Sequence, residues 1–263
     1  MYIFKFDFLY ILILSLTTYV YNYISPSDSY ILSKEIASAS SFYGLNSTKT
    51  DSHMMKNSEW GAVAYLTQSS YGRSGTEVTI NSKNLNNLKS KYIYAVTGYA
   101  GSTANGVAAS STNDMSGVFD LSGCVWERTA GYITNGNQNL STFGSSYVEK
   151  ITADLDGYKT LSTEYATVYP YDSSDSYKNN YNKYKELKLN TYGYGDAILE
   201  TSTADSGATS WNQDYSAFPA SVASFFTRVG DYGSSSTAGA FAFYGTGGNP
   251  GHGSGFRAVL VGV

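Results

Sequence analysis

The chain has very few of the residues from which cross-linked and metal-dependent sites are built. Its 263 residues include one cysteine, two histidines and four prolines. The single cysteine, Cys124, excludes an intramolecular disulfide, a two-cysteine redox motif and a zinc cluster held by several thiolates. A metal site made of imidazoles and a carboxylate would need both His53 and His252. Otherwise we expect each histidine to be an exposed side chain.

Charged residues are also scarce, and the chain has no stripe of positive charge. Asp, Glu, Lys and Arg together make up 14% of the residues, and the net charge is −4. Ordinary soluble domains contain roughly 25% charged residues. Glu186 interrupts the one local group of lysines, which consists of Lys178, Lys183, Lys185 and Lys188. Because clustered Lys and Arg bind nucleic-acid phosphates, we expect no nucleic-acid partner.

Tyrosine and glycine dominate the composition instead, with 26 residues of each. Tyrosine offers a large contact area, a polar tip and little rotamer entropy, so surfaces rich in Tyr, Ser, Gly and Asn suit recognition. The same mixture is common in irregular, loop-rich folds. Composition alone leaves both interpretations open.

The beginning of the chain is apolar. Residues 8–24 contain no charge, Lys5 precedes them, and a helix needs about 20 apolar residues to span a bilayer. We therefore predict three segments: a hydrophobic anchor or signal at residues 1–25, a Ser/Thr-rich linker at 26–50, and one folded domain at 51–263. The predicted location is extracytoplasmic, either membrane-anchored through the first segment or secreted. A buried core element and a misassigned start are the alternatives for that segment.

The remaining sequence predicts a mixed α+β domain with few helices and much ordered loop. A helix begins at Asn57 or Ser58, either of which can cap it, and Trp60 and Val63 fall on one of its faces. Three polar stretches are predicted to be irregular: residues 130–146, 154–190 and 195–210. Short strands between glycine-rich loops are predicted at residues 76–80, 92–99, 225–230, 239–244 and 256–261.

Four short motifs follow one another along the chain. They read S-E-W from residue 58, N-D-M-S-G-V-F-D-L-S-G-C-V-W-E from residue 113, R-V-G-D from residue 228 and G-F-R-A-V-L from residue 255. This set resembles the sulfatase-modifying-factor family of formylglycine-generating enzymes. The family's usual wording is E-W on a helix, G-L-Y-D-M-S-G-N-V-W-E-W, R-G-G-S-W and G-F-R. The order and rough spacing match from Ser58 to Leu260.

The resemblance implies a C-type-lectin-like fold with short antiparallel strands. Variable receptor-binding proteins diversified by retroelements share this architecture and the G-F-R ending, and they bind through the segment just before it. That segment corresponds to residues 231–254 here. The chain also resembles bacterial surface proteins that carry the domain behind a pilin-like membrane anchor, although residues 1–24 lack a pilin cleavage pattern.

The resemblance carries expectations about chemistry as well. Formylglycine-generating enzymes hold copper with two cysteines in their C-terminal part, and this chain has none after Cys124, so it has no soft copper site. Cys124 replaces an Asn that helps to hold calcium in the family, and a thiol is a poor calcium ligand. Glu127, Asp154 and Asp156 remain as calcium candidates, and no other cofactor is expected.

The motifs have a structural interpretation beside the resemblance. Trp126 is predicted to be a core anchor, and Arg257 to form a buried or half-buried ion pair with Asp120 or Glu127. Cys124 is expected to be a small buried side chain and not a reactive thiol. The residues assigned to this structural motif are Trp60, Gly117, Asp120, Gly123, Trp126, Glu127, Arg228, Gly255, Phe256 and Arg257.

Together these observations predict a non-catalytic recognition or adhesion domain at the cell surface, which binds a protein or glycan through Tyr- and Gly-rich C-terminal loops. One alternative is a sulfatase-modifying-factor-type enzyme of unidentified chemistry, with titratable groups converging near Arg228, Arg257 and Glu127. Another is a structural subunit of a surface filament or phage-like particle. The candidate contact residues are Trp211, Asn212, Asp214, Tyr215, Tyr232, Phe243, Tyr244, Asn249 and His252.

Overall fold

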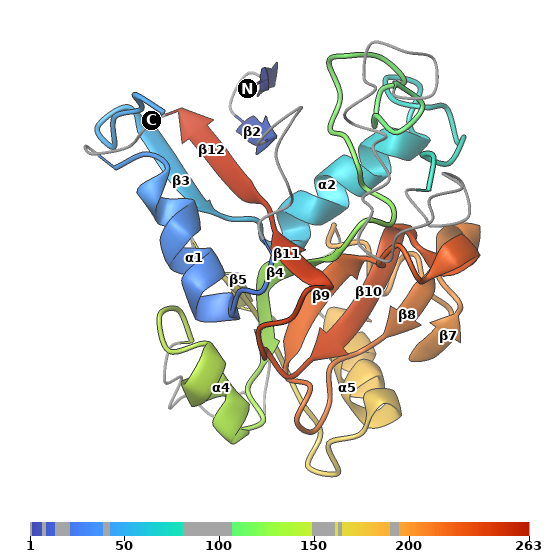
Figure 1. Ribbon diagram of the computed structural model, residues 1–263. Coiled ribbons are helices and arrows are strands. Elements are labelled where there is room, and N and C mark those ends of the chain that lie inside the picture. The colour runs from blue at the N-terminus through green and yellow to red at the C-terminus, as the bar shows by residue number, and fades with distance from the viewer. Residues whose placement is uncertain are drawn as a thin grey trace.

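Two β-sheets and a few helices form the protein (Figure 1). The computed structural model describes residues 2–6, 9–13, 22–38, 43–80, 107–148, 161–162, 165–189 and 195–262. Helices and mixed sheets occur together in these residues, which confirms the predicted α+β class.

The larger sheet has eight strands and lies at the centre of the protein. Its strands are β4 (Trp126–Ile133), β5 (Leu161–Ser162), β6 (Thr167–Tyr169), β7 (Ser206–Ala208), β8 (Tyr215–Ala217), β9 (Phe225–Val229), β10 (Gly239–Thr246) and β11 (Ser254–Phe256). Their order is β5-β6-β4-β9-β10-β8-β7, and β11 pairs with β4. The central pairs β4–β9 and β9–β10 are antiparallel, whereas β8 runs parallel to β10.

The smaller sheet has four strands in the order β1-β2-β12-β3. These are β1 (Tyr2–Phe6), β2 (Leu9–Ile13), β3 (Thr50–Met54) and β12 (Ala258–Gly262). Only Arg257 separates β11 from β12, so the chain passes directly from the larger sheet to the smaller one. The predicted strand at residues 256–261 is therefore two strands that belong to different sheets.

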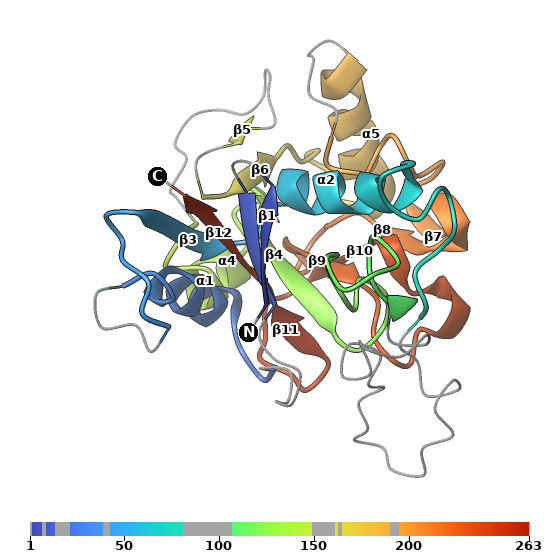
Figure 2. The same cartoon turned by 90° about the horizontal axis from the view of Figure 1, so that it is seen from above.

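Two of the helices cover one face of the larger sheet. Those in the described residues are α1 (Pro26–Glu35), α2 (Asn57–Gln68), α4 (Gln138–Phe143) and α5 (Tyr177–Leu189), with 3-10 turns η1 (Trp211–Gln213) and η2 (Ser235–Thr237). Seen from above, α2 and α5 lie on the same side of β9 and β10 (Figure 2). Within the described part of the chain, no helix lies in front of the opposite side of β8, β9 and β10 (Figure 1).

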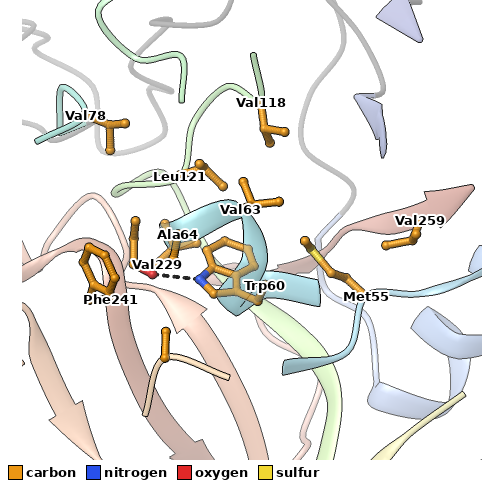
Figure 3. Close-up of a cluster of buried hydrophobic side chains, with 12 residues drawn as sticks. Met55, Trp60, Val63, Ala64, Val78, Val118, Leu121, Val229, Phe241 and Val259 are labelled. Carbon is orange, nitrogen blue, oxygen red and sulfur yellow. Dashed lines mark hydrogen bonds between the residues drawn. The ribbon is translucent and has the colours of Figure 1, made fainter. Parts of the chain in front are cut away.

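Helix α2 is held by a tryptophan and by a close backbone approach. Trp60 is 1% exposed, and its indole Nε1 donates a 2.7 Å hydrogen bond to the carbonyl of Ala240 in β10 (Figure 3). A Cβ atom on Gly61 would lie 1.9 Å from the carbonyl oxygen of Gly195. The predicted helix is confirmed, although its N-cap is Lys56, whose backbone N–H donates to the Glu59 carboxylate.

The N-terminal part differs from the prediction. Residues 26–35, predicted as a linker, form α1, which packs against β3, so the linker prediction is wrong for this segment. Its serines support this packing: Ser33 is buried, and the Ser52 hydroxyl donates to the Ser33 carbonyl. Within the predicted anchor, β1 and β2 are strands, and β2 pairs with β12. No helix among the described residues is both long and apolar enough to span a bilayer.

The other predicted elements have mixed outcomes. The strands predicted at residues 225–230 and 239–244 are confirmed as β9 and β10. Residues 76–80 do not form a strand, so this prediction is wrong; the Thr76 and Glu77 carbonyls accept from Arg73 Nε instead. The segment 92–99 lies outside the described residues. The polar segments contain β4, α4 and α5, which the sequence analysis missed.

We predict that Gly61→Ala destabilises the protein by about 1–3 kcal/mol, because the new methyl group has no room beside Gly195. In an exposed helix the same change stabilises by roughly 1 kcal/mol, so the sign of the effect tests the helix packing. Urea denaturation measures it. The matched control is Ala62→Gly at the exposed neighbouring position, which is expected to cost about 1 kcal/mol. A stabilised Gly61→Ala variant would contradict this packing.

Candidate recognition surface

Two of the nine candidate contact residues are not at the surface. Asp214 and Phe243 are both 0% exposed, so their assignment as contact residues is wrong. Phe243 belongs to a buried aromatic cluster, where the Arg228 guanidinium lies 5.7 Å from its ring centre. The exposed candidates are Trp211, Asn212, Asn249 and His252, and the half-buried ones are Tyr215, Tyr232 and Tyr244.

Asp214 is buried because its carboxylate supports the start of β10. Its Oδ2 accepts a hydrogen bond of 2.9 Å from the Phe241 N–H, and the carboxylate lies directly against Gly239, whose added Cβ would be 2.0 Å away. Burial raises the Asp214 pKa to about 8; the Phe241 N–H opposes this effect, and the Glu77 charge adds to it. The side chain is therefore a structural acid that is protonated at neutral pH.

The exposed candidates lie in separate places. Trp211 packs beside Phe241 and Tyr65, with ring centres 5.1 and 6.0 Å away. His252 instead contacts Tyr23 in the N-terminal segment, at 4.9 Å between ring centres. The structure therefore does not bring the predicted residues together as one site.

The loop that contains Asn249 and His252 is occupied by the protein's own N-terminal segment. The amide of Asn22 donates to the His252 carbonyl, and the Tyr23 N–H donates to the Gly251 carbonyl, both at 3.0 Å. The buried Arg128 side chain links the same two segments. Its Nε donates to the Ile24 carbonyl and its Nη2 to the Asn249 carbonyl. This loop therefore holds the chain in place, which restricts its use as a mobile binding loop.

Three aromatic side chains, Trp126, Tyr244 and Tyr215, form a continuous group on the helix-free face of the larger sheet, and Tyr177 of α5 lies close enough to two of them to interact electrostatically. The Tyr244 ring lies 5.5 Å from the Trp126 ring and 5.9 Å from the Tyr215 ring, measured between centres. Tyr177, at the start of α5, is 39% exposed. Its pKa is raised first by partial burial and then by the neighbouring phenols of Tyr244 and Tyr215. We call Trp126, Tyr244, Tyr215 and Tyr177 the aromatic row.

The alternation of side chains along the strands places this row at the surface. Successive residues of a strand point to opposite faces. In β10, Phe243 packs into the core on the side of α5, so Tyr244 points to the helix-free face. Trp126, the first residue of β4, contacts Tyr244 on that face and is only half-buried. The prediction of Trp126 as a core anchor is therefore wrong, and Trp60 has that role.

The sequence analysis identified two members of the row as contacts and missed the other two. Tyr215 and Tyr244 were candidates, whereas Trp126 was assigned to the core and Tyr177 lies in a segment predicted to be irregular. Helical spacing places Tyr177 on the same face of α5 as the buried Tyr181 and Tyr184, so no local pattern marks it as a surface residue. Tyr232 is half-buried near Cys124, and its N–H donates to the Cys124 carbonyl.

The ion pair predicted for Arg257 is confirmed, and Glu127 is the partner. Arg257 Nε and Nη2 donate to the two carboxylate oxygens of Glu127 at 2.8 and 2.5 Å. Burial alone lowers the Arg257 pKa, but the hydrogen-bonded charge of Glu127 outweighs burial and raises it. Both Glu127 oxygens accept from Arg257, so this carboxylate is already engaged in an ion pair. Asp154 and Asp156 lie outside the described residues.

The motif glycines mark crowded or left-handed backbone. A Cβ on Gly117 would lie 2.1 Å from the Ser110 hydroxyl, and Gly123 has a φ of +79°. Cys124 follows with a φ of +69°, and burial raises its thiol pKa to about 12, with the Asp120 and Glu127 charges adding to the effect. This shift favours the protonated thiol, although Cys124 is half-buried and not fully buried as predicted.

His53 is buried in a cluster of acids and not exposed as predicted. It is 4% exposed, and its Nδ1 and Nε2 lie 2.5 and 2.8 Å from the carboxylates of Asp51 and Glu59. Burial lowers the His53 pKa, but the two carboxylates outweigh burial and raise it. His53 therefore links β3 to α2 through its contact with Glu59. In the described part of the chain, no three His, Cys, Asp or Glu side chains are grouped to hold a metal ion.

The groups that an enzyme would need near Arg228 are engaged in structural contacts. Arg228 is 0% exposed, and its guanidinium donates to Asn57 Oδ1 and to the carbonyls of Ala197 and Asp196. Arg257 and Glu127 neutralise one another. These side chains hold the fold together, which disfavours the alternative of an enzyme built around them.

No family model matches the chain, and no curated protein matches it at a significant level. The function must therefore be argued from the residues and their geometry.

We predict that Glu127→Gln destabilises the protein by about 3 kcal/mol, because it leaves the buried Arg257 charge without its partner. Urea denaturation at pH 7 measures the loss. Glu186→Gln, at an exposed position of α5, is the control and is expected to change stability by less than about 0.5 kcal/mol. Equal stability of the two variants would show that the Glu127–Arg257 pair does not support the fold.

We predict that Asp214→Asn makes the protein more stable than the wild type above pH 8. The folded-state pKa of Asp214 lies above its ordinary value, so its contribution is fully present below about pH 4 and is lost as the pH rises to about 8. Asparagine cannot ionise and can still accept from Phe241. Free energies of unfolding between pH 5 and 9 measure the difference, which is expected to exceed about 1 kcal/mol at high pH.

The control for this measurement is Asp114→Asn. Hydrogen bonds from Ser116 lower the pKa of this exposed carboxylate, so it stays ionised throughout the range from pH 5 to 9. Its substitution therefore leaves the slope of stability against pH unchanged. If the free energies of unfolding of Asp214→Asn and the wild type change in parallel with pH, Asp214 is ionised in the folded protein.

Proposed function

We propose that this chain is a non-catalytic recognition or adhesion domain, which binds a protein or glycan partner through the aromatic row. The observation that carries the proposal is the row itself: Trp126, Tyr244 and Tyr215 gather on a sheet face that no helix of the described residues covers, and Tyr177 lies near them at the start of α5. Aromatic side chains with a polar edge give large contact area for little loss of side-chain entropy. This places the contact surface on strands β4, β8 and β10 and at the start of α5.

We further propose that the domain is a variant of the C-type-lectin-like fold of sulfatase-modifying factors. Support comes from the way the four motifs meet in space. The tryptophan of the first motif is bonded to β10, and the arginine of the last motif is paired with the glutamate of the second. The arginine of the third motif, Arg228, bonds to Asn57 at the start of α2. An extracytoplasmic location belongs to the same proposal and is supported by the apolar residues 8–24.

We predict that the double variant Tyr215→Ala/Tyr244→Ala loses at least about tenfold in binding, which corresponds to about 1.4 kcal/mol. The probe is an array of immobilised glycans and extracellular-matrix proteins, on which the wild-type chain is scored first. The double variant removes the centre of the aromatic row. Because both side chains are half-buried, the single variant Tyr177→Ala, at an exposed position, provides a test with little effect on folding.

Tyr71→Ala is the matched control, since Tyr71 is 87% exposed and follows the C-terminal end of α2, away from the row. Circular dichroism and urea denaturation verify that each variant is folded. If folded row variants keep wild-type binding to every bound probe, the row is not the contact surface.

A further inference from the structure

The shape and size of the aromatic row indicate what kind of partner it fits. Its consecutive ring centres are 5.5 and 5.9 Å apart, with ring planes tilted by 39° and 58°, so the rings form a twisted strip. These steps are comparable to the length that one pyranose ring adds to an extended sugar chain. The strip can therefore offer about one aromatic ring to each sugar.

The exposed area of the row is small for a protein partner. Tyr177 is 39% exposed and the other three side chains are half-buried. A fully buried aromatic side chain covers about 150–250 Å², so the row presents on the order of 300 Å². A stable protein–protein interface buries about 800 Å² on each partner. A narrow ligand that follows the strip fits this area better.

The row also lacks the charge that an ionic partner would need. The groups that shift the pKa of Tyr177, besides its own burial, are the two neutral phenols of Tyr244 and Tyr215. Glu127, the charged residue next to Trp126 in the chain, points to the opposite face of β4 and is paired with Arg257. Phenol and indole edges provide hydrogen bonds without charge. This combination matches a neutral sugar, which has apolar C–H faces and hydroxyl groups around its rim.

We propose that the aromatic row binds a neutral oligosaccharide in extended form, with sugar rings stacked along Trp126, Tyr244, Tyr215 and Tyr177. The inference rests on the proposed recognition function and narrows its partner to a neutral glycan. Binding requires no metal ion, because the contacts are aromatic faces and uncharged hydrogen-bonding groups.

The test is isothermal titration of the full chain with β-1,4-linked glucose and N-acetylglucosamine oligosaccharides of one to six units. The affinity for one of the two series is expected to rise with each added sugar up to four and then level off, because the row contains four rings. Addition of EDTA leaves the affinity unchanged. Tyr244→Ala and Tyr177→Ala each lower the affinity at least tenfold, whereas Tyr71→Ala leaves it as in the wild type.

Tryptophan fluorescence gives an independent readout of where the sugar lies. The ligand changes the emission of Trp126, so the change is lost in Trp126→Phe and kept in Trp211→Phe, whose side chain is 43% exposed in a different aromatic group. This pattern supports the site even if Tyr244→Ala is unstable. A signal lost only in Trp211→Phe would overturn the assignment to the row.

Failure of this inference differs from failure of the proposed function. One outcome is that neither oligosaccharide series binds, whereas a protein of the immobilised array binds the wild type and not the row variants. In that case the glycan proposal is wrong and the recognition function remains. If oligosaccharides bind equally well to the wild type and to the row variants, the row is wrong as the binding surface for both proposals.

Discussion

The buried guanidinium of Arg228 is the interaction on which most of this fold depends. It donates to Asn57 at the start of α2 and to two carbonyls of the segment that follows α5. Asn57 in turn accepts from Thr129 of β4 and donates to Tyr169 of β6. Because a buried charge is costly unless its donors are satisfied, each of these elements is held in one position relative to β9. A network of this kind fixes a single arrangement even where regular structure is sparse.

This arrangement decides which aromatic side chains are available at the surface. Arg228 lies on the α2 side of the sheet and also faces the Phe243 ring, so that side of β10 belongs to the core. The alternation along β10 then leaves Tyr244 on the other side, between Trp126 and Tyr215. Since β8 runs parallel to β10 and pairs Ala217 with Tyr244, Tyr215 is brought to the same face. The candidate surface is thus a direct consequence of the core.

The sequence was informative where a local pattern decided the structure. Periodicity predicts the helix at Trp60, and glycine placement predicts the strands at Phe225 and Gly239. The pairing of Arg257 follows because a buried cation needs an acidic partner. The aromatic row was only half predictable, because its members come from four elements that are distant in the sequence. Phe243 was misplaced because a short strand has the same polarity pattern whichever face is buried, and Asp214 because its partner, the Phe241 N–H, is distant in the sequence.

The C-terminal glycine-rich loop shows how a segment with the composition of a binding loop can have a structural role. Arg128 is 1% exposed and joins the carbonyl of Ile24 to that of Asn249. Hydrogen bonds from the Asn22 side chain and the Tyr23 backbone N–H continue this contact. A loop that rearranged to enclose a ligand would break these bonds and leave the Arg128 cation with fewer acceptors. Burial already lowers the pKa of Arg128 to about 10. The energetic cost favours a fixed loop, and it leaves recognition to a surface that is rigid before the partner arrives.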